Sequence, residues 1–143
     1  MNETESLYQS VILERSRQPR FRRRLTGVPF AGKCANPLCG DEVAVELHFD
    51  HAQRISEVGF SGEGCAILLA ASDLMAEAVT GLAAREACAL GEAFDAMLGG
   101  GSDVADRALA CFGPLRAYPA RRRCATLAWE ALGQAVTPVG EGA

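Results

Sequence analysis

Two runs of alternating apolar and polar residues constrain the fold of this chain more than any other feature. The first run, EVAVELHF, spans residues 42–49, and the second, RISEVGF, spans residues 54–60. A period of two is typical of half-buried strands, whose successive side chains point to opposite faces. The polar turn DHAQ separates the runs, so the pattern predicts an antiparallel hairpin. One face of the first strand carries Val43, Val45, Leu47 and Phe49.

Helical patterns surround this hairpin. Apolar residues at helical spacing predict helices over 5–16, 65–79 and 82–98, a short helix capped by Ser102 or Asp103 that ends near Cys111, and a last helix from Pro119. We expect connectors over 17–25 and 112–118, a weak strand over 26–33 that Pro29 interrupts, and an end to the sheet at SGEG, residues 61–64.

This order of elements predicts an α+β fold. A helix comes first, then a small antiparallel sheet of about three strands, then helices that pack on one face of the sheet. The 143 residues fit a single domain over 1–143, with a frayed tail from about residue 137.

Charge and apolar content exclude some classes of protein. The formal net charge of −4 argues against a dedicated nucleic-acid binder. The longest apolar run, Cys65 to Ala71, is too short to cross a membrane, and the N-terminus has no signal-peptide pattern. We therefore expect a cytoplasmic protein with reduced thiols.

Arginines gather in two segments of the chain. Such runs indicate either a solvated surface or a docking surface for an acidic partner, and the sequence leaves both open. The clusters are Arg15, Arg17, Arg20, Arg22, Arg23 and Arg24, and then Arg116, Arg121, Arg122 and Arg123.

Three cysteines fall near the predicted ends of elements. Cys39 lies in the turn sequence NPLCGD, Cys65 opens a helix after a glycine-rich turn, and Cys124 lies early in the last helix. With Asp41 they supply four ligands, the number that tetrahedral zinc takes. The dipole of the helix that Cys65 opens and the three arginines before Cys124 favour thiolates. The alternative is that these cysteines are small core residues.

The remaining cysteines and histidines carry weaker expectations. Cys88 and Cys111 are predicted to be packed in the core, and Cys34 is left as a spare thiol. His48 and His51 are expected to be exposed rather than metal ligands.

Four segments together resemble the IscU/NifU-like family of iron–sulfur cluster assembly proteins. They are LYQSVILERSRQPR, NPLCGD, GFSGEGCAILLAASDLM and YPARRRCATLAWEAL, and the resemblance runs from about residue 6 to 136. Three features resemble the SufU type more than the scaffold type of this family. The stretch AYPARRR replaces the scaffold's leucine–proline–proline–valine–lysine motif, Arg123 replaces its histidine, and residues 81–118 hold extra material.

The SufU resemblance implies a set of residue roles. It makes Cys39, Asp41, Cys65 and Cys124 zinc ligands, makes Cys39 the sulfur acceptor, and places Arg123 as a supporting residue beside the last ligand. It implies persulfide transfer from a SufS-type, pyridoxal-phosphate-dependent cysteine desulfurase to a downstream Suf assembly scaffold.

Two alternatives remain open at the level of the sequence. One is a scaffold on which a [2Fe–2S] cluster is assembled, so that iron or the cluster replaces zinc. The other is a zinc-stabilised adaptor that activates the desulfurase by docking.

Overall fold

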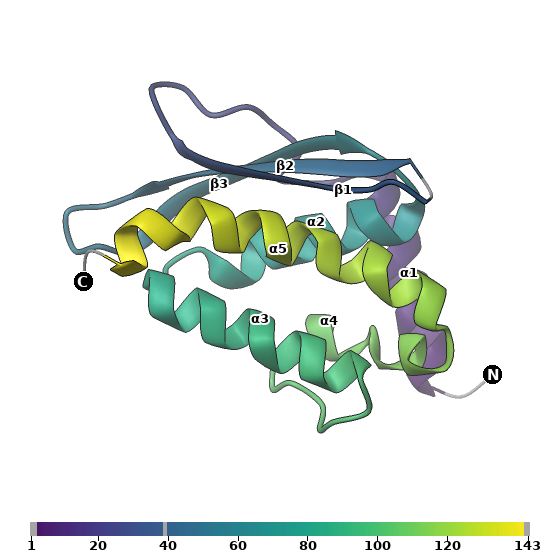
Figure 1. Cartoon of the computed structure of the whole chain (residues 1–143). Helices are drawn as coiled ribbons and strands as arrows, with labels where there is room; N and C mark the ends of the chain where they lie inside the picture. Colours follow the sequence, from purple (N-terminus) through teal and green to yellow (C-terminus); the bar gives the residue numbers. More distant parts are fainter. Residues whose placement is uncertain (1–2, 39, 142–143) are drawn as a thin grey trace.

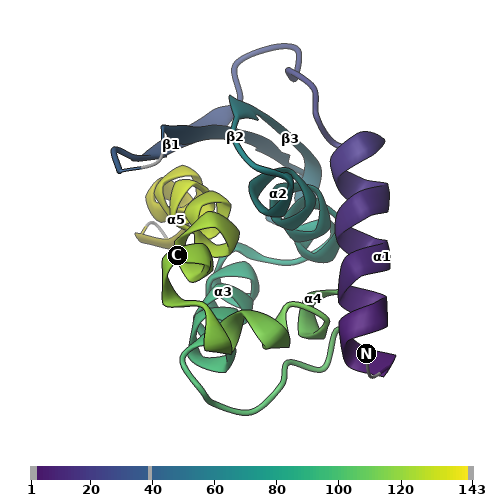
Figure 2. The ribbon, with the colours of Figure 1, turned by 90° about the vertical axis from the view of Figure 1, so that its right-hand side faces the viewer.

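The computed structural model describes residues 3–38 and 40–141. Its elements are α1 (Glu3–Arg17), β1 (Phe30–Asn36), β2 (Asp41–Phe49), β3 (Ile55–Glu63), α2 (Ala66–Val79), α3 (Ala84–Leu98), α4 (Arg107–Ala110), the 3-10 helix η1 (Gly113–Ala117) and α5 (Pro119–Glu141). The predicted α+β class is confirmed. Figures 1 and 2 show the sheet as one layer, α2 and α5 as the next, and α3 with α4 as the third, while α1 runs along one side.

The sheet is antiparallel throughout, in the order β1–β2–β3. Val43, Val45 and Leu47 of β2 are buried against the helices, as their alternation predicts. Residues directly opposite in neighbouring strands share a face, so Gly32 of β1 and Phe60 of β3, which both pair with Val45, also face the helices.

Helix α5 lies unusually close to β1. A Cβ on Gly32 would lie 2.0 Å from the carbonyl oxygen of Ala131, so no side chain fits between the helix and the strand there. The amide of Lys33 donates to Oε1 of Gln134 (3.0 Å), which satisfies one backbone group at this edge of the sheet. Together these contacts hold α5 along β1.

Several predicted boundaries differ from the observed ones. Strand β1 covers 30–36 rather than 26–33, because it begins after Pro29, which has no amide hydrogen to donate. Strand β3 continues to Glu63, since the glycine at 62 can take a φ of 146° and pair with Val43. Within the connector predicted after Cys111 the chain forms η1.

The ends of α4 and α5 also differ from the prediction. Asp106, not Ser102 or Asp103, caps α4, with its carboxylate accepting from the amide of Leu109 (3.1 Å). Helix α5 extends to Glu141, beyond the helix predicted to end near residue 136, and the expected fraying from about residue 137 stays a prediction. Val136 is buried, whereas Thr137 and Pro138 after it are exposed.

A buried ion pair holds α1 against α2. Nη1 of Arg15 lies 2.7 Å from Oδ2 of Asp73, whose side chain is fully buried. The other carboxylate oxygen of Asp73 accepts from the amide of Phe21 (2.7 Å), and Glu77 receives the second nitrogen of Arg15 at 2.9 Å. Both oxygens of Asp73 are therefore occupied, as burial of a carboxylate requires.

Much of the N-terminal arginine cluster is used within the chain. Arg20 and Arg24 pair with glutamates, and Arg22 and Arg23 donate to the carbonyl oxygens of Gly62 and Val58. These contacts favour a structural role for the segment over a docking surface. Separately, none of the helices in the described residues combines the length and apolar character needed to cross a membrane.

We predict that Asp73→Ala lowers the free energy of unfolding by about 3 kcal/mol, because it removes one of the two carboxylates that hold the buried Arg15 guanidinium and the acceptor of the Phe21 amide. Urea denaturation followed by circular dichroism measures this loss. Glu14→Gln is the matched control, since Glu14 pairs with Arg20 on the surface and its loss should cost about 0.5 kcal/mol or less. Equal losses in the two variants would contradict the role given to Asp73.

Candidate metal centre

The turn between β1 and β2 positions the first residue of the site. The amide of Gly40 donates to the carbonyl oxygen of Asn36 (3.0 Å), and the amide of Leu38 donates to the side-chain oxygen of Asn36 (3.1 Å). These bonds close the turn and place Asp41 at the start of β2. Cys39 lies outside the described residues, so its predicted roles stay predictions.

The connection from β3 to α2 brings the second residue to Asp41. Cys65 is the N-cap of α2, with extended backbone angles, and its carbonyl oxygen accepts from the amide of Leu69. The preceding Gly64 packs so tightly that a Cβ there would lie 2.8 Å from Cγ of Asp41 and 2.4 Å from Leu68. The glycine-rich turn therefore has a steric role in the site.

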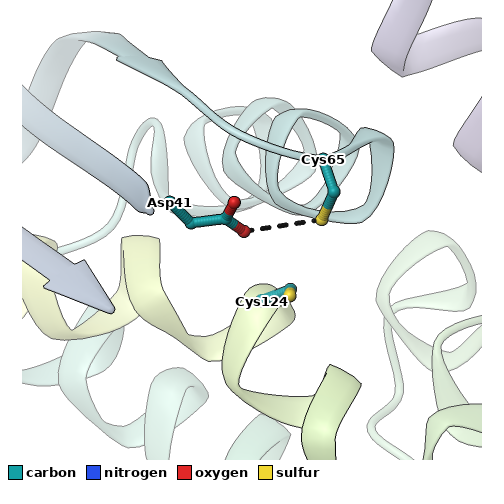
Figure 3. A group of neighbouring side chains, drawn as sticks. All are labelled: Asp41, Cys65 and Cys124. Atoms are coloured by element: carbon teal, nitrogen blue, oxygen red, sulfur yellow. Dashed lines mark hydrogen bonds between the residues drawn. The ribbon is translucent and has the colours of Figure 1, made fainter. Parts of the chain in front are cut away.

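The third residue, Cys124, comes from the beginning of α5. One ligand atom each from Asp41, Cys65 and Cys124 lies within 4.8 Å of the other two. The Cys65 thiol donates to Oδ2 of Asp41 at 3.5 Å (Figure 3). The structure thus brings together three of the four predicted ligands from three separate parts of the chain.

The spacing of these atoms suits a small cation. Two sulfur ligands of a tetrahedral zinc ion, each at ~2.3 Å, are separated by about 3.8 Å. The observed limit of 4.8 Å therefore requires a contraction of about 1 Å or less. Side-chain rotation within a preformed site is enough for such a movement.

The charge of the site also suits a cation. Asp41 is only 6% exposed, and a buried carboxylate is costly without a compensating charge. In the described part of the chain no arginine or lysine forms an ion pair with Asp41. The residues present therefore fit a bound divalent metal ion with sulfur and oxygen ligands.

The protonation of Cys124 differs from the sequence expectation. Burial, together with the neighbouring Cys65 and Asp41, raises the pKa of the Cys124 thiol to about 12. The preceding arginines do not offset this rise, because Arg122 donates to the carbonyl oxygen of Arg116 and Arg123 bonds Glu130. The pKa of Cys124 is therefore raised by its burial, rather than lowered as the arginines in the sequence predict.

Arg123 is directed to the flank of the site. Its guanidinium pairs with the carboxylate of Glu130, and Nη2 lies 3.7 Å from the sulfur of Cys34. The Cys34 thiol in turn donates to Glu130 (3.0 Å). Burial and the Glu130 carboxylate raise the pKa of Cys34, so this spare thiol is held in its protonated form.

The other predicted residues divide into correct and incorrect cases. Cys111 is buried as predicted, and burial raises the pKa of its thiol to about 12. Cys88 is exposed, so its predicted packing role is wrong, because its side of α3 turns away from the core. His51 is exposed, while the ring of His48 bonds the carbonyl oxygen of Thr26 (2.7 Å).

Comparison with known proteins decides the family. The sequence pattern of the family described as "NifU-like N terminal domain" matches residues 7–139 of this chain. The chain belongs to this family. The predicted IscU/NifU-like resemblance is therefore confirmed, and with it membership of a family of iron–sulfur cluster assembly proteins.

Two curated relatives bear different names. The chain is 34% identical over 139 residues to the iron–sulfur cluster assembly scaffold protein IscU of Streptococcus pyogenes, which covers 95% of this chain and 86% of that protein. It is 29% identical over 137 residues to the zinc-dependent sulfurtransferase SufU of Bacillus subtilis. That match covers 92% of this chain and 90% of the B. subtilis protein. The names thus include both functional types that the sequence leaves open.

Solved structures confirm the fold. A SufU from Fervidobacterium islandicum, described as a putative assembly scaffold for the SUF system, gives a TM-score of 0.84 at 27% identity and covers 93% of this chain and 98% of its own. The N-terminal part of a NifU-like protein from Brucella abortus gives a TM-score of 0.85 at 26% identity. It covers 97% of this chain and 98% of its own.

Sequence reasoning missed two neighbours of the site. Glu130 holds both Arg123 and Cys34, and Tyr8 of α1 lies near Cys65 and Cys124, where burial raises the pKa of its hydroxyl. The seven-residue spacing of Arg123 and Glu130 on one helix, two turns apart, is a signal that could have found the first.

The first prediction for this site concerns pH. Because the pKa of Cys124 is raised to about 12, its sulfur is protonated at neutral pH and a metal ion must displace that proton. Zinc affinity should therefore rise about tenfold per pH unit for each proton released, between about pH 6 and pH 9. Competition with a chromogenic chelator measures the affinity, and an affinity independent of pH would contradict this account.

The second prediction concerns the turn. Gly64→Ala places a Cβ against Asp41, so we expect the zinc affinity to fall about 10- to 100-fold, as when a ligand's support is lost. Gly133→Ala is the control, because a Cβ there meets no atom within 4 Å and alanine favours a helix. Unchanged zinc affinity of Gly64→Ala, in a folded variant, would show that the close contact has no role in the site.

Proposed function

We propose that this chain is a zinc-bound sulfur-transfer protein that accepts persulfide sulfur from a SufS-type cysteine desulfurase. The observation that carries the proposal is the site itself. A buried carboxylate and two thiols from distant segments lie within 4.8 Å of one another, and the turn that leads to Asp41 holds a third cysteine, Cys39.

The proposed ligands are Cys39, Asp41, Cys65 and Cys124. Bound zinc would keep the cysteine sulfurs as thiolates and suppress their oxidation. Three thiolates and one carboxylate around a divalent ion would carry a net charge of about −2. Such an excess of negative charge is costly in a buried site. That charge would favour release of one sulfur, and Cys39 is the candidate because the turn-forming residues Pro37 and Gly40 lie close to it in the sequence.

The transfer step is a thiol exchange that needs no external oxidant. The Cys39 thiolate attacks the outer sulfur of the persulfide carried by the desulfurase cysteine. A sulfur–sulfur bond forms at Cys39 as the bond to the desulfurase cysteine breaks, and that cysteine leaves as a thiolate. One sulfur atom moves, and the charge and electron count of the pair are unchanged.

The similarity to the B. subtilis protein named zinc-dependent sulfurtransferase SufU supports this assignment. The stretch before Cys124, AYPARRR, also supports this assignment. It has neither the leucine–proline–proline–valine–lysine motif nor the histidine of scaffold-type members. We propose a cytoplasmic location, a pyridoxal-phosphate-dependent desulfurase as sulfur donor and a Suf assembly scaffold as acceptor.

A second candidate function is that of a scaffold for a [2Fe–2S] cluster. The 34% identity to the S. pyogenes protein named IscU supports it. In that case the proposed zinc ligands would instead hold the cluster until it is transferred to another protein. Anaerobic reconstitution with iron and sulfide that gives a stable visible absorption would favour the scaffold. An adaptor that only activates the desulfurase is the third interpretation.

We predict that the zinc-loaded protein, incubated with a SufS-type desulfurase and cysteine, gains sulfur at Cys39. Mass spectrometry under non-reducing conditions measures the gain, and peptide mapping locates it. The Cys39→Ala variant should lose at least about 90% of the added sulfur, because it lacks the attacking thiolate.

Cys88→Ala is the matched control, since Cys88 is an exposed cysteine outside the site, and it should accept sulfur like the wild type. Sulfur acceptance by Cys39→Ala at the wild-type level would refute the role of Cys39. Stimulation of the desulfurase with no sulfur gained by the wild type would favour the adaptor.

A further inference from the structure

A groove of about 310 Å³ lies between α3 and α5, and none of Asp41, Cys65 and Cys124 lines it. The two helices run side by side in opposite directions (Figure 1). Its floor includes Gly91 of α3 with Trp129 and Gly133 of α5. Trp129 packs on Phe94 with ring centroids 5.7 Å apart, so the floor rests directly on the core.

Gly133 has no packing reason to be glycine within the described chain. A Cβ at this position would meet no atom within 4 Å, whereas a Cβ on Gly91 would lie 3.0 Å from the Trp129 ring. Glycine is also less favourable inside a helix than any residue except proline. The missing side chain at Gly133 therefore leaves the groove open at a cost to α5.

The rim of the groove is acidic. Glu92 and Asp95 are exposed on α3, and neither forms an ion pair with any residue in 3–38 or 40–141. Glu130 adds a third carboxylate from α5, which pairs with Arg123. Neither lysine nor arginine occurs among the described residues that line the groove. Its unpaired charge is therefore negative.

We propose that this groove docks a short cationic helix of a partner protein. Small apolar residues on one face of that helix fit the open floor at Gly133, in the way that amphipathic helices fill grooves between helices. Lysines or arginines along its edges pair with Glu92 and Asp95, whose charge repels nucleic acid and anionic membranes. None of the proposed metal ligands lines this groove, although Glu130 joins its rim to Arg123 at the flank of the metal centre. Docking there does not depend on sulfur transfer.

The test uses the full, zinc-loaded chain and a fluorescein-labelled amphipathic peptide of about four helical turns. The peptide carries alanine and leucine on one face and lysine along both edges. We expect saturable binding by anisotropy that weakens with salt. The emission of Trp129 should change in parallel, since it is the single tryptophan of the chain and lies in the groove.

Two variants should weaken binding. Gly133→Leu fills the groove where a side chain has open space, so the protein should fold with an unchanged or higher Tm while affinity falls at least about tenfold. Glu92→Gln combined with Asp95→Asn should weaken binding about tenfold through lost charge. Glu57→Gln is the control, because Glu57 is an exposed carboxylate on β3, and it should bind like the wild type.

The outcomes separate the proposal from its alternatives. Absence of saturable binding, or equal binding by wild type and Gly133→Leu, would overturn it. If Gly133→Leu instead changes the sedimentation of the protein alone, the occupant is a second copy of this chain and the proposed cationic partner is wrong. These results do not depend on sulfur acceptance, so they leave the proposed function to its own test.

Discussion

The close contact between α5 and β1 is the constraint on which the site depends. Gly32 allows the strand to lie against the backbone of Ala131, where a Cβ would approach its oxygen to 2.0 Å. From this contact β1 runs four residues to Asn36, roughly 13 Å, and α5 runs back seven residues to Cys124, roughly 10 Å. The turn before Asp41 and the sulfur of Cys124 therefore meet at the same end of the sheet.

Two buried aspartates show how differently the fold treats negative charge. Asp73 is fully buried, and Arg15 and the amide of Phe21 satisfy its oxygens. Asp41 is also buried, yet its neighbours at the site are the thiols of Cys65 and Cys124. The first arrangement is complete within the chain, whereas the second becomes electrostatically balanced when a cation binds. This contrast is the physical basis for a metal centre at Asp41.

The sequence predicted those features that depend on local pattern. Alternation identified β2 and the buried face of Val43, Val45 and Leu47, and the apolar run before residue 79 identified α2. The order of elements was enough for the fold class. The element ends were less predictable, because β3 reaches Glu63 through pairing with β2, a contact between segments that local pattern does not contain.

The sequence was enough to predict which residues form the candidate site, but not how their neighbours are arranged. Motifs identified Asp41, Cys65 and Cys124, and the structure brings them together. Side-chain directions could not be predicted, since the arginines that precede Cys124 turn to other partners and Cys88 faces solvent. The effect of a nearby arginine on the pKa of a cysteine depends on which groups that arginine contacts in the fold, and spacing along the sequence does not show this.

The most direct test of the metal centre is X-ray absorption at the zinc edge of the zinc-loaded protein. The account predicts about three sulfur ligands near 2.3 Å and one oxygen near 2.0–2.2 Å, from Cys39, Cys65, Cys124 and Asp41. A first coordination sphere of nitrogen and oxygen alone would contradict the account, because it would place zinc away from these cysteines.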